Sequence, residues 1–174
     1  MTKCQLIETF VKNHQILVDY IDQLEEEGYL YTQGRKWTAG QQLHHVGSTI
    51  VPFTKALVSK EYLVQKFGDL DRSTWSYQTV LDNYAKTSLK APEQFLPPAE
   101  VSFEQKETII TSLRSDLEKI SALLELYEED ELDLLVIPHP LLGKMNIREI
   151  FYLMGYHPIH HLKQIKTLLN DYKV

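Results

Sequence analysis

Three of the seven histidines in this chain fall within five residues near the end of the sequence: His157, His160 and His161. On an α-helix, residues four apart lie on one face, so the imidazoles of His157 and His161 have the spacing needed to bind one metal ion. The only cysteine, Cys4, has no second cysteine with which to build a thiolate cage. A metal site in this chain is therefore expected to use nitrogen and oxygen ligands.

The hydrophobic pattern of the last helical segment separates these histidines. Its apolar positions define a face toward the core, and at roughly 100° per residue His161 and His157 lie within about 80° of the centre of that face. His160 lies about 140° from the centre, toward solvent. The pattern therefore favours His157 and His161 as the inward pair. Gln164 lies on the line of His157, where its amide could hydrogen-bond to a ligand ring or a metal-bound water, although a glutamine at the surface edge fits equally well.

Two common metal motifs are absent from the sequence. No glutamate follows His157 as in His-Glu-x-x-His, the motif that carries the general base of zinc proteases. Glu-x-x-His, which carboxylate-bridged di-iron bundles need on two helices, does not occur either. A third ligand must come from another element. Periodicity does not choose between the candidates, which are His14, His44, His45 and His139.

The spacing of apolar residues predicts an almost entirely helical chain. Four main helices and one additional short helix are expected, at about residues 6–27, 38–57, 73–89, 102–127 and 146–172, the short one being 73–89. Gly28 is expected to end the first helix. The apolar run at 134–137 is interpreted as a buried connection, because a lone strand would have no partner.

Side-chain caps and prolines refine these boundaries. Capping-box pairs predict three of the helix starts, at Thr38/Gln41, Ser102/Gln105 and Asn146/Glu149. Pro52 is expected to bend the second helix. Pro158 removes the N–H that would bond to the carbonyl of Met154 and disfavours helical geometry at the preceding histidine. We expect a mild kink there that re-aims one imidazole and keeps the pair.

Composition and charge narrow the class of protein. A chain of 174 residues without a repeat or linker is expected to form one domain, 1–174. Its net charge of −6, with no basic stripe, argues against nucleic-acid binding. No apolar run approaches the roughly 20 residues of a membrane span. The single cysteine fits a reducing compartment, so a cytoplasmic protein without membrane association is expected.

Three segments together resemble the DinB/YfiT-like superfamily of metalloenzymes: Trp37-Thr-Ala-Gly-Gln-Gln-Leu-His-His45, then His139-Pro-Leu-Leu-Gly-Lys, then His157-x-x-His-His161-x-x-Gln164. The resemblance covers about Trp37 to the end of the chain. It implies a four-helix bundle with up-down-down-up topology, often dimeric, which holds a divalent metal between helices. A set of imidazole ligands is typical of zinc or nickel. Position by position, it implies His45, His157 and His161 as the metal ligands.

The resemblance leaves the reaction open. Three neutral imidazoles leave coordination positions free, as in catalytic sites, where the ion can activate water or hold a thiol as thiolate. Family members of known activity include thiol-dependent transferases and an isomerase that use mycothiol or bacillithiol. We therefore expect a hydrolase or an S-transferase acting on a small molecule, the transferase with a low-molecular-weight thiol as cosubstrate. The alternative is a non-catalytic metal-binding, sensing or stress-associated interaction protein. No catalytic acid or base is identified.

Four further residues are candidates to support the ligands or to line the pocket: Gln164, His139, His160 and Trp37. His139 stands between two prolines, where fixing a turn or lining the pocket mouth is favoured over ligation. Trp37 is favoured as a plug of the core at the start of a helix.

Overall fold

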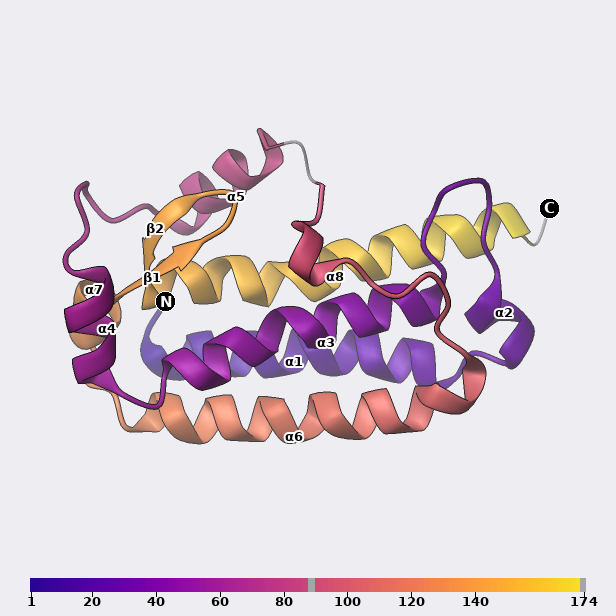
Figure 1. The fold of residues 1–174 in the computed structure, drawn as a ribbon, viewed down its shortest axis with the longest axis horizontal. Helices are drawn as coiled ribbons and strands as arrows, with labels where there is room; N and C mark the ends of the chain where they lie inside the picture. The colour runs from indigo at the N-terminus through magenta and orange to yellow at the C-terminus, as the bar shows by residue number, and fades with distance from the viewer. Residues whose placement is uncertain (88–89, 173–174) are drawn as a thin grey trace.

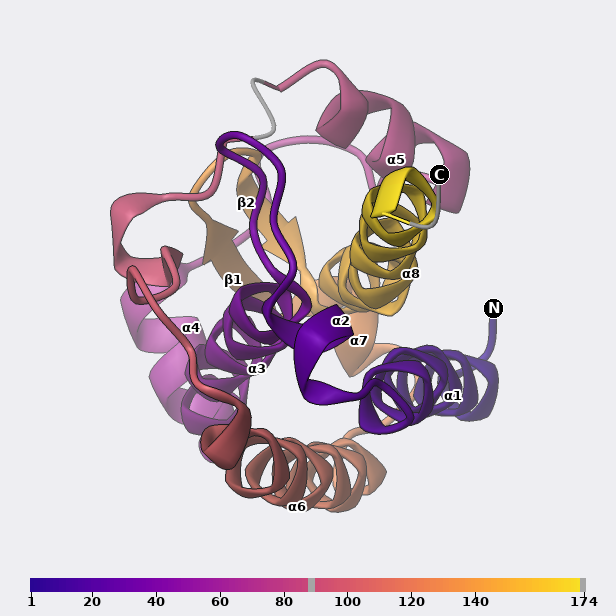
Figure 2. The same cartoon turned by 90° about the vertical axis from the view of Figure 1, so that its right-hand side faces the viewer.

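Four long helices form the framework of this computed structural model, which describes residues 1–87 and 90–172. They are α1 (Lys3–Asp22), α3 (Ala39–Ala56), α6 (Lys106–Glu125) and α8 (Ile147–Tyr172). α1 and α8 run in one direction and α3 and α6 in the other (Figure 1). α1 packs against α8 and α6, and α3 packs against the same two helices, so the four enclose a common interior (Figure 2). The expectation of a mainly helical chain is confirmed.

Each long helix contributes one apolar face to the core, as the periodicity predicted. The buried side chains include Leu17 and Ile21 from α1, Leu43 and Ile50 from α3, Leu113 and Ile120 from α6, and Ile150 and Ile165 from α8. Burial of such side chains is the main driving force for packing the helices together. Within residues 1–87 and 90–172, no helix has both the length and the apolar character needed to cross a membrane.

The expectation of one additional short helix was wrong, because the described residues contain several short elements. Most of these lie at the ends of the long helices or in the connection between α3 and α6 (Figure 1). They are α2 (Glu26–Leu30), α4 (Lys60–Phe67), α5 (Tyr77–Ala85), α7 (Glu131–Leu134) and two 3₁₀ turns, η1 (Glu93–Phe95) and η2 (Phe103–Gln105).

The first helix ends earlier than predicted, at Asp22 rather than before Gly28. The three glutamates at 25–27 explain the difference, because acidic side chains stabilise the first turn of a helix. Here Glu25 is the N-cap residue of the separate helix α2, Glu26 and Glu27 lie in its first turn, and Gly28 lies inside it. α2 in turn buries Tyr29 completely.

The run at 134–137 was wrongly interpreted as a connection. Its second half belongs to β1 (Val136–His139), which pairs antiparallel with β2 (Gly143–Asn146), with Val136 opposite Asn146. The hairpin turns through Gly143, whose φ of 72° lies in the left-handed region that glycine adopts without strain. The partner strand was not foreseen because Gly-Lys-Met-Asn carries no strand signal of its own.

The short helix expected at 73–89 is α5, which covers only Tyr77–Ala85. Ser76 caps it by accepting a hydrogen bond from the backbone of Thr79, so the residues before Ser76 remain outside the helix. α5 packs on the outer side of α8. The predicted end at 88–89 lies outside the described residues.

The two helices that carry the histidines begin at the predicted caps. Thr38 and Gln41 exchange side-chain to backbone hydrogen bonds of 3.0 Å at the start of α3. Asn146 and Glu149 do the same at the start of α8, at 3.1 and 2.9 Å. The fully buried Glu149 also receives two 2.8 Å hydrogen bonds from Arg72. These caps fix where each helix starts and therefore which residues face the interior. The Ser102/Gln105 pair is confirmed as well, at η2 just before α6.

We predict that Gly40→Ala lowers the free energy of unfolding by about 1–3 kcal/mol, as overpacking of a core does. A Cβ at this position would lie 2.6 Å from the buried ring of Tyr29. Gly47→Ala in the same helix is the matched control, since a Cβ there would meet no atom within 4 Å. Gly47→Ala should raise stability by about 0.5–1 kcal/mol, the helix-propensity gain of alanine over glycine. Urea denaturation of both variants measures this, and equal stability of the two would contradict the prediction.

Candidate metal centre

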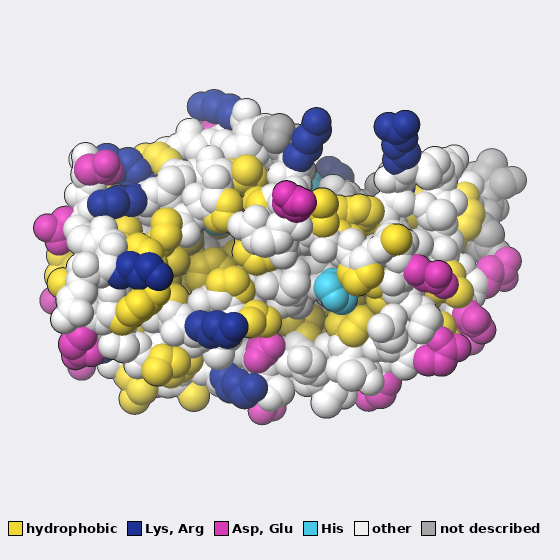
Figure 3. All heavy atoms as spheres, viewed as in Figure 1, with side chains coloured by type: hydrophobic (Ala, Val, Ile, Leu, Met, Phe, Trp, Pro, Cys, Tyr) yellow, Lys and Arg dark blue, Asp and Glu magenta, His cyan; other side chains and the backbone are white. Residues whose placement is uncertain are grey.

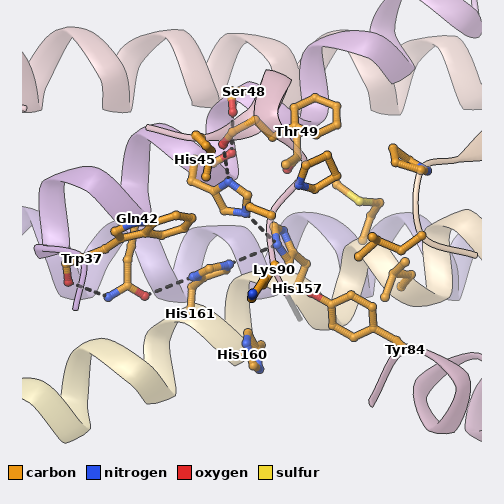
Figure 4. Close-up of a pocket in the computed structure, with 18 of the residues that line it drawn as sticks. Trp37, Gln42, His45, Ser48, Thr49, Tyr84, Lys90, His157, His160 and His161 are labelled. Atoms are coloured by element: carbon orange, nitrogen blue, oxygen red, sulfur yellow. Dashed lines mark hydrogen bonds between the residues drawn. The ribbon is translucent and has the colours of Figure 1, made fainter. Parts of the chain in front are cut away.

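The side chains of His45, His157 and His161 meet in the interior between α3 and α8. All three are buried, and one ligand atom of each lies within 4.8 Å of the others. The Nε2 atom of His157 is 3.2 Å from Nε2 of His45 and 3.0 Å from Nε2 of His161. Figure 4 shows the three rings turned toward one another. The three side chains are therefore positioned to hold a metal ion.

His45 is oriented by a backbone carbonyl outside the long helices. Its Nδ1 lies 2.7 Å from the carbonyl oxygen of Phe95 in η1. A carbonyl only accepts, so Nδ1 carries the proton and Nε2 of the neutral ring keeps a free lone pair. The contact thus selects the form of His45 that can bind a metal through Nε2.

His161 is oriented by a chain of two hydrogen bonds. The Gln42 amide nitrogen donates to the backbone carbonyl of Trp37 at 3.3 Å, which turns the amide oxygen of Gln42 toward Nδ1 of His161, 3.0 Å away. That oxygen can only accept, so His161 also carries its proton on Nδ1 and presents a free lone pair at Nε2. The Trp37 ring lies parallel to the His161 ring, with centroids 6.3 Å apart.

His157 completes the group from the middle of α8. Pro158 lies inside this helix, which continues without a break to Tyr172, so the pair of histidines four residues apart is kept. Nδ1 of His157 is buried and has no hydrogen-bond partner within the described residues. Its Nε2 stands between the other two. When this nitrogen is also unprotonated, three lone pairs face one point, an arrangement that repels itself unless a cation lies between them.

Burial keeps these imidazoles neutral. It lowers the pKa of His157 and of His161 well below 6.5, and the neighbouring histidines add to the effect. Burial also lowers the pKa of His45, partly offset by the hydrogen bond to Phe95. Neutral imidazole is the form that binds metal ions, so at neutral pH the site does not have to lose protons first.

The other candidate residues lie around this group without joining it. The Gln164 amide donates at 2.8 Å to His160 rather than to one of the three imidazoles, and both residues line the cavity described below. His139 lines the same cavity, and its Nδ1 accepts backbone hydrogen bonds from Leu141 and Leu142, so it also fixes the hairpin turn.

The remaining histidines lie outside the group of three. His14 is buried on α1, where its Nδ1 donates to the carbonyl of Phe10 at 2.7 Å. His44 has a buried Nδ1 without a partner in the described part of the chain. Among the candidates for a third ligand, the structure thus brings His45 to the inward pair.

Two supporting groups were not foreseen from the sequence. Gln42 lies three residues before His45, on the same side of α3, and that spacing is the only signal that could have pointed to it. The carbonyl of Phe95 has no signal in the sequence, because any residue would supply it. Both groups are recognisable only once α8 and η1 are placed beside α3.

The sequence profile of the DinB superfamily matches residues 9–165, which is most of the chain and includes all three histidines. The chain belongs to the DinB superfamily. A search of curated proteins finds no match. The earlier resemblance is thereby confirmed at the level of the family.

A cavity of about 1430 Å³ opens onto the three histidines of this DinB-superfamily protein. Its walls come from α3, α8, the hairpin and the residues around η1. Most of the lining is apolar or aromatic, including Phe53, Phe95, Leu141, Leu153 and Met154. Ligands the size of a metabolite therefore have access to the histidine group from one side.

We predict that Gln42→Ala weakens metal binding by this DinB protein about 10- to 100-fold, as loss of such an outer partner commonly does. Without the amide oxygen, Nδ1 of His161 loses its acceptor and the ring is no longer held in one tautomer. Gln164→Ala is the control, because Gln164 hydrogen-bonds to His160 and to none of the three grouped histidines. Competition titration with a chromophoric zinc chelator measures both affinities. Equal affinities for the two variants would contradict the role of Gln42.

We also predict that acidification destabilises the metal-free protein through His14. Burial lowers the pKa of His14 from 6.5 to about 4. Between these two values the unfolded state binds a proton that the folded state does not, so stability falls as pH drops from about 6.5 to 4, by at most about 1.4 kcal/mol per pH unit for this group. In His14→Leu the free energy of unfolding should fall less steeply with decreasing pH. Chemical denaturation at pH 7, 6 and 5 tests this, and identical slopes for the two proteins would refute it.

Proposed function

We propose that this DinB-superfamily protein is a metal-dependent enzyme in which His45, His157 and His161 bind one divalent ion. The observation that carries the proposal is the convergence of three Nε2 atoms, two of them held free of protons by the contacts of Nδ1. Three imidazoles without thiolate or carboxylate suit zinc or nickel. A set of three protein ligands also leaves coordination positions for a substrate, as catalytic sites do.

When bound, such an ion would act as a Lewis acid toward water or a small thiol. The protein's own part is to orient the imidazoles and to surround the open side with apolar walls that limit access of bulk water. Cys4 is exposed on α1 and does not line the cavity, so a reacting thiol would have to come from a second small molecule.

Two features favour thiol-dependent S-transfer over hydrolysis. Aspartate and glutamate are absent from the described residues that line the cavity, so a carboxylate general base is not supplied there, whereas a thiolate nucleophile needs none. The volume of about 1430 Å³ exceeds the roughly 300–1,000 Å³ of usual single-ligand pockets, which leaves room for two reactants.

The proposal extends to the assembly expected from the family. The opposite directions of the α1/α8 and α3/α6 pairs support the up-down-down-up four-helix bundle. We further propose that the chain forms a single domain and a homodimer, because the family resemblance implies both. The lone cysteine supports a cytoplasmic location.

We predict that the purified protein binds close to one equivalent of zinc or nickel, and that His45→Ala and His161→Ala each lose most of it. His160→Ala is the control, because His160 lies outside the group of three and should leave the metal content unchanged. Elemental analysis after dialysis, with circular dichroism to confirm folding, gives the measurement. A wild-type protein without stoichiometric metal, or retention by both variants, would refute the site.

Turnover separates the enzyme from a non-catalytic metal protein. The metal-loaded protein should conjugate a low-molecular-weight thiol to a chlorinated aromatic faster than it hydrolyses an activated ester. His161→Ala should abolish the conjugation. Bound metal with no turnover in either assay would favour the non-catalytic, stress-associated alternative.

A further inference from the structure

Basic side chains line the cavity of a protein whose overall charge is negative. The chain carries a net charge of −6, with 24 acidic residues against 18 lysines and arginines. The described residues that line the cavity nevertheless include four basic residues and neither aspartate nor glutamate. The basic residues are Arg35, Lys36, Lys90 and Lys163. The cavity therefore concentrates positive charge against the trend of the whole molecule.

These residues stand at the mouth rather than at the histidine floor. All four are exposed. Arg35 and Lys36 belong to the segment between α2 and α3, and Lys163 lies on α8, half a turn beyond His161. Basic side chains rise on both sides of a notch in the outline of the molecule (Figure 3).

Two of the four basic side chains have no partner among the described residues. Lys36 forms an ion pair with Asp171 at 3.3 Å. Arg35 and Lys163, by contrast, have no hydrogen bond or ion pair to their side chains within residues 1–87 and 90–172. Their charges are therefore available to attract an anion that enters the cavity.

Between these basic residues at the mouth, called the rim below, and the histidines, most of the cavity wall is apolar. Phe53, Leu153 and Leu168 are part of its walls, and Trp37 stands beside the imidazoles. A ligand that satisfies both regions has an apolar or aromatic body and an anionic group at one end. A neutral ligand of the same shape would gain nothing from the rim.

We propose that the cavity selects organic carboxylates, with Arg35 and Lys163 holding the carboxylate at the mouth while the apolar body extends toward the histidines. Arginine matches a carboxylate with two parallel N–H donors, and lysine adds a compact charge. This inference rests on the proposed function only where it implies that the bound carboxylate goes on to react at the metal. Recognition of the anion itself requires no metal.

A matched pair of probes tests the inference: 2-naphthoate and its neutral counterpart 2-naphthamide. Their affinities are measured by calorimetry on metal-stripped and on zinc-loaded protein at low salt. The carboxylate should bind about tenfold or more tightly than the amide to the metal-stripped protein. This advantage should shrink with added NaCl, because exposed charges are screened.

Two double variants test whether the basic residues at the mouth cause the preference for the carboxylate. Arg35→Gln with Lys163→Gln should remove most of the preference for the carboxylate and leave amide binding unchanged. Lys12→Gln with Lys119→Gln is the control of equal net charge, since neither lysine lines the cavity, and it should retain the preference.

The outcomes separate this inference from the metal proposal. Equal binding of both probes, binding of neither, or a preference that survives Arg35→Gln/Lys163→Gln would overturn the inference. A preference seen only with zinc and insensitive to those substitutions would place the carboxylate on the ion, which refutes the rim and supports the metal site. A rim-dependent preference in a protein that retains no metal would uphold the inference while the metal proposal fails.

Discussion

The three-histidine group depends on the protonation of two ring nitrogens, Nδ1 of His45 and Nδ1 of His161. Hydrogen bonds from Nδ1 of His45 and of His161 to carbonyl oxygens leave both Nε2 atoms as bare acceptors, and His157 presents its own Nε2 between them. Burial opposes the alternative of charging the rings. A neutral His157 carries only one proton on Nε2 with which to satisfy these acceptors, which lie 3.2 Å (His45) and 3.0 Å (His161) away. A single metal ion would instead bind the lone pairs of all three rings.

The rest of the fold serves to keep those nitrogens together. Two of the three histidines come from α8 and the third from α3, so the group exists only while these two helices keep their positions along each other. The caps at Thr38 and Asn146 fix the start of each helix, and the Arg72–Glu149 pair ties the start of α8 to the loop between α4 and α5. The core behind the site then sets the distance between the helices.

The amino-acid pattern predicts the inward pair well, because the periodicity of α8 is strong and a helix keeps its phase through Pro158. It predicts His45 less well. His44 and His45 both lie on the flank of α3, and only the family resemblance favoured one of them before the packing of α3 against α8 was known. Gln42 and the carbonyl of Phe95 act on residues far away in the chain, so no local pattern reveals them. The β-hairpin escaped prediction because its second strand is held by pairing and a glycine turn rather than by strand propensity.

The hydrogen bond from His45 to Phe95 makes the connection between α5 and α6 part of the centre's thermodynamics. A metal ion bound to Nε2 would draw electron density from the ring and make the Nδ1–H a stronger donor, so metal binding and the contact of His45 with η1 would stabilise each other. The same 3₁₀ turn forms part of the cavity wall. Metal occupancy and the shape of the cavity wall would therefore be coupled through this one peptide carbonyl. If a bound ion changed the affinity of the cavity for a ligand, that ligand would change the affinity for the ion by the same factor.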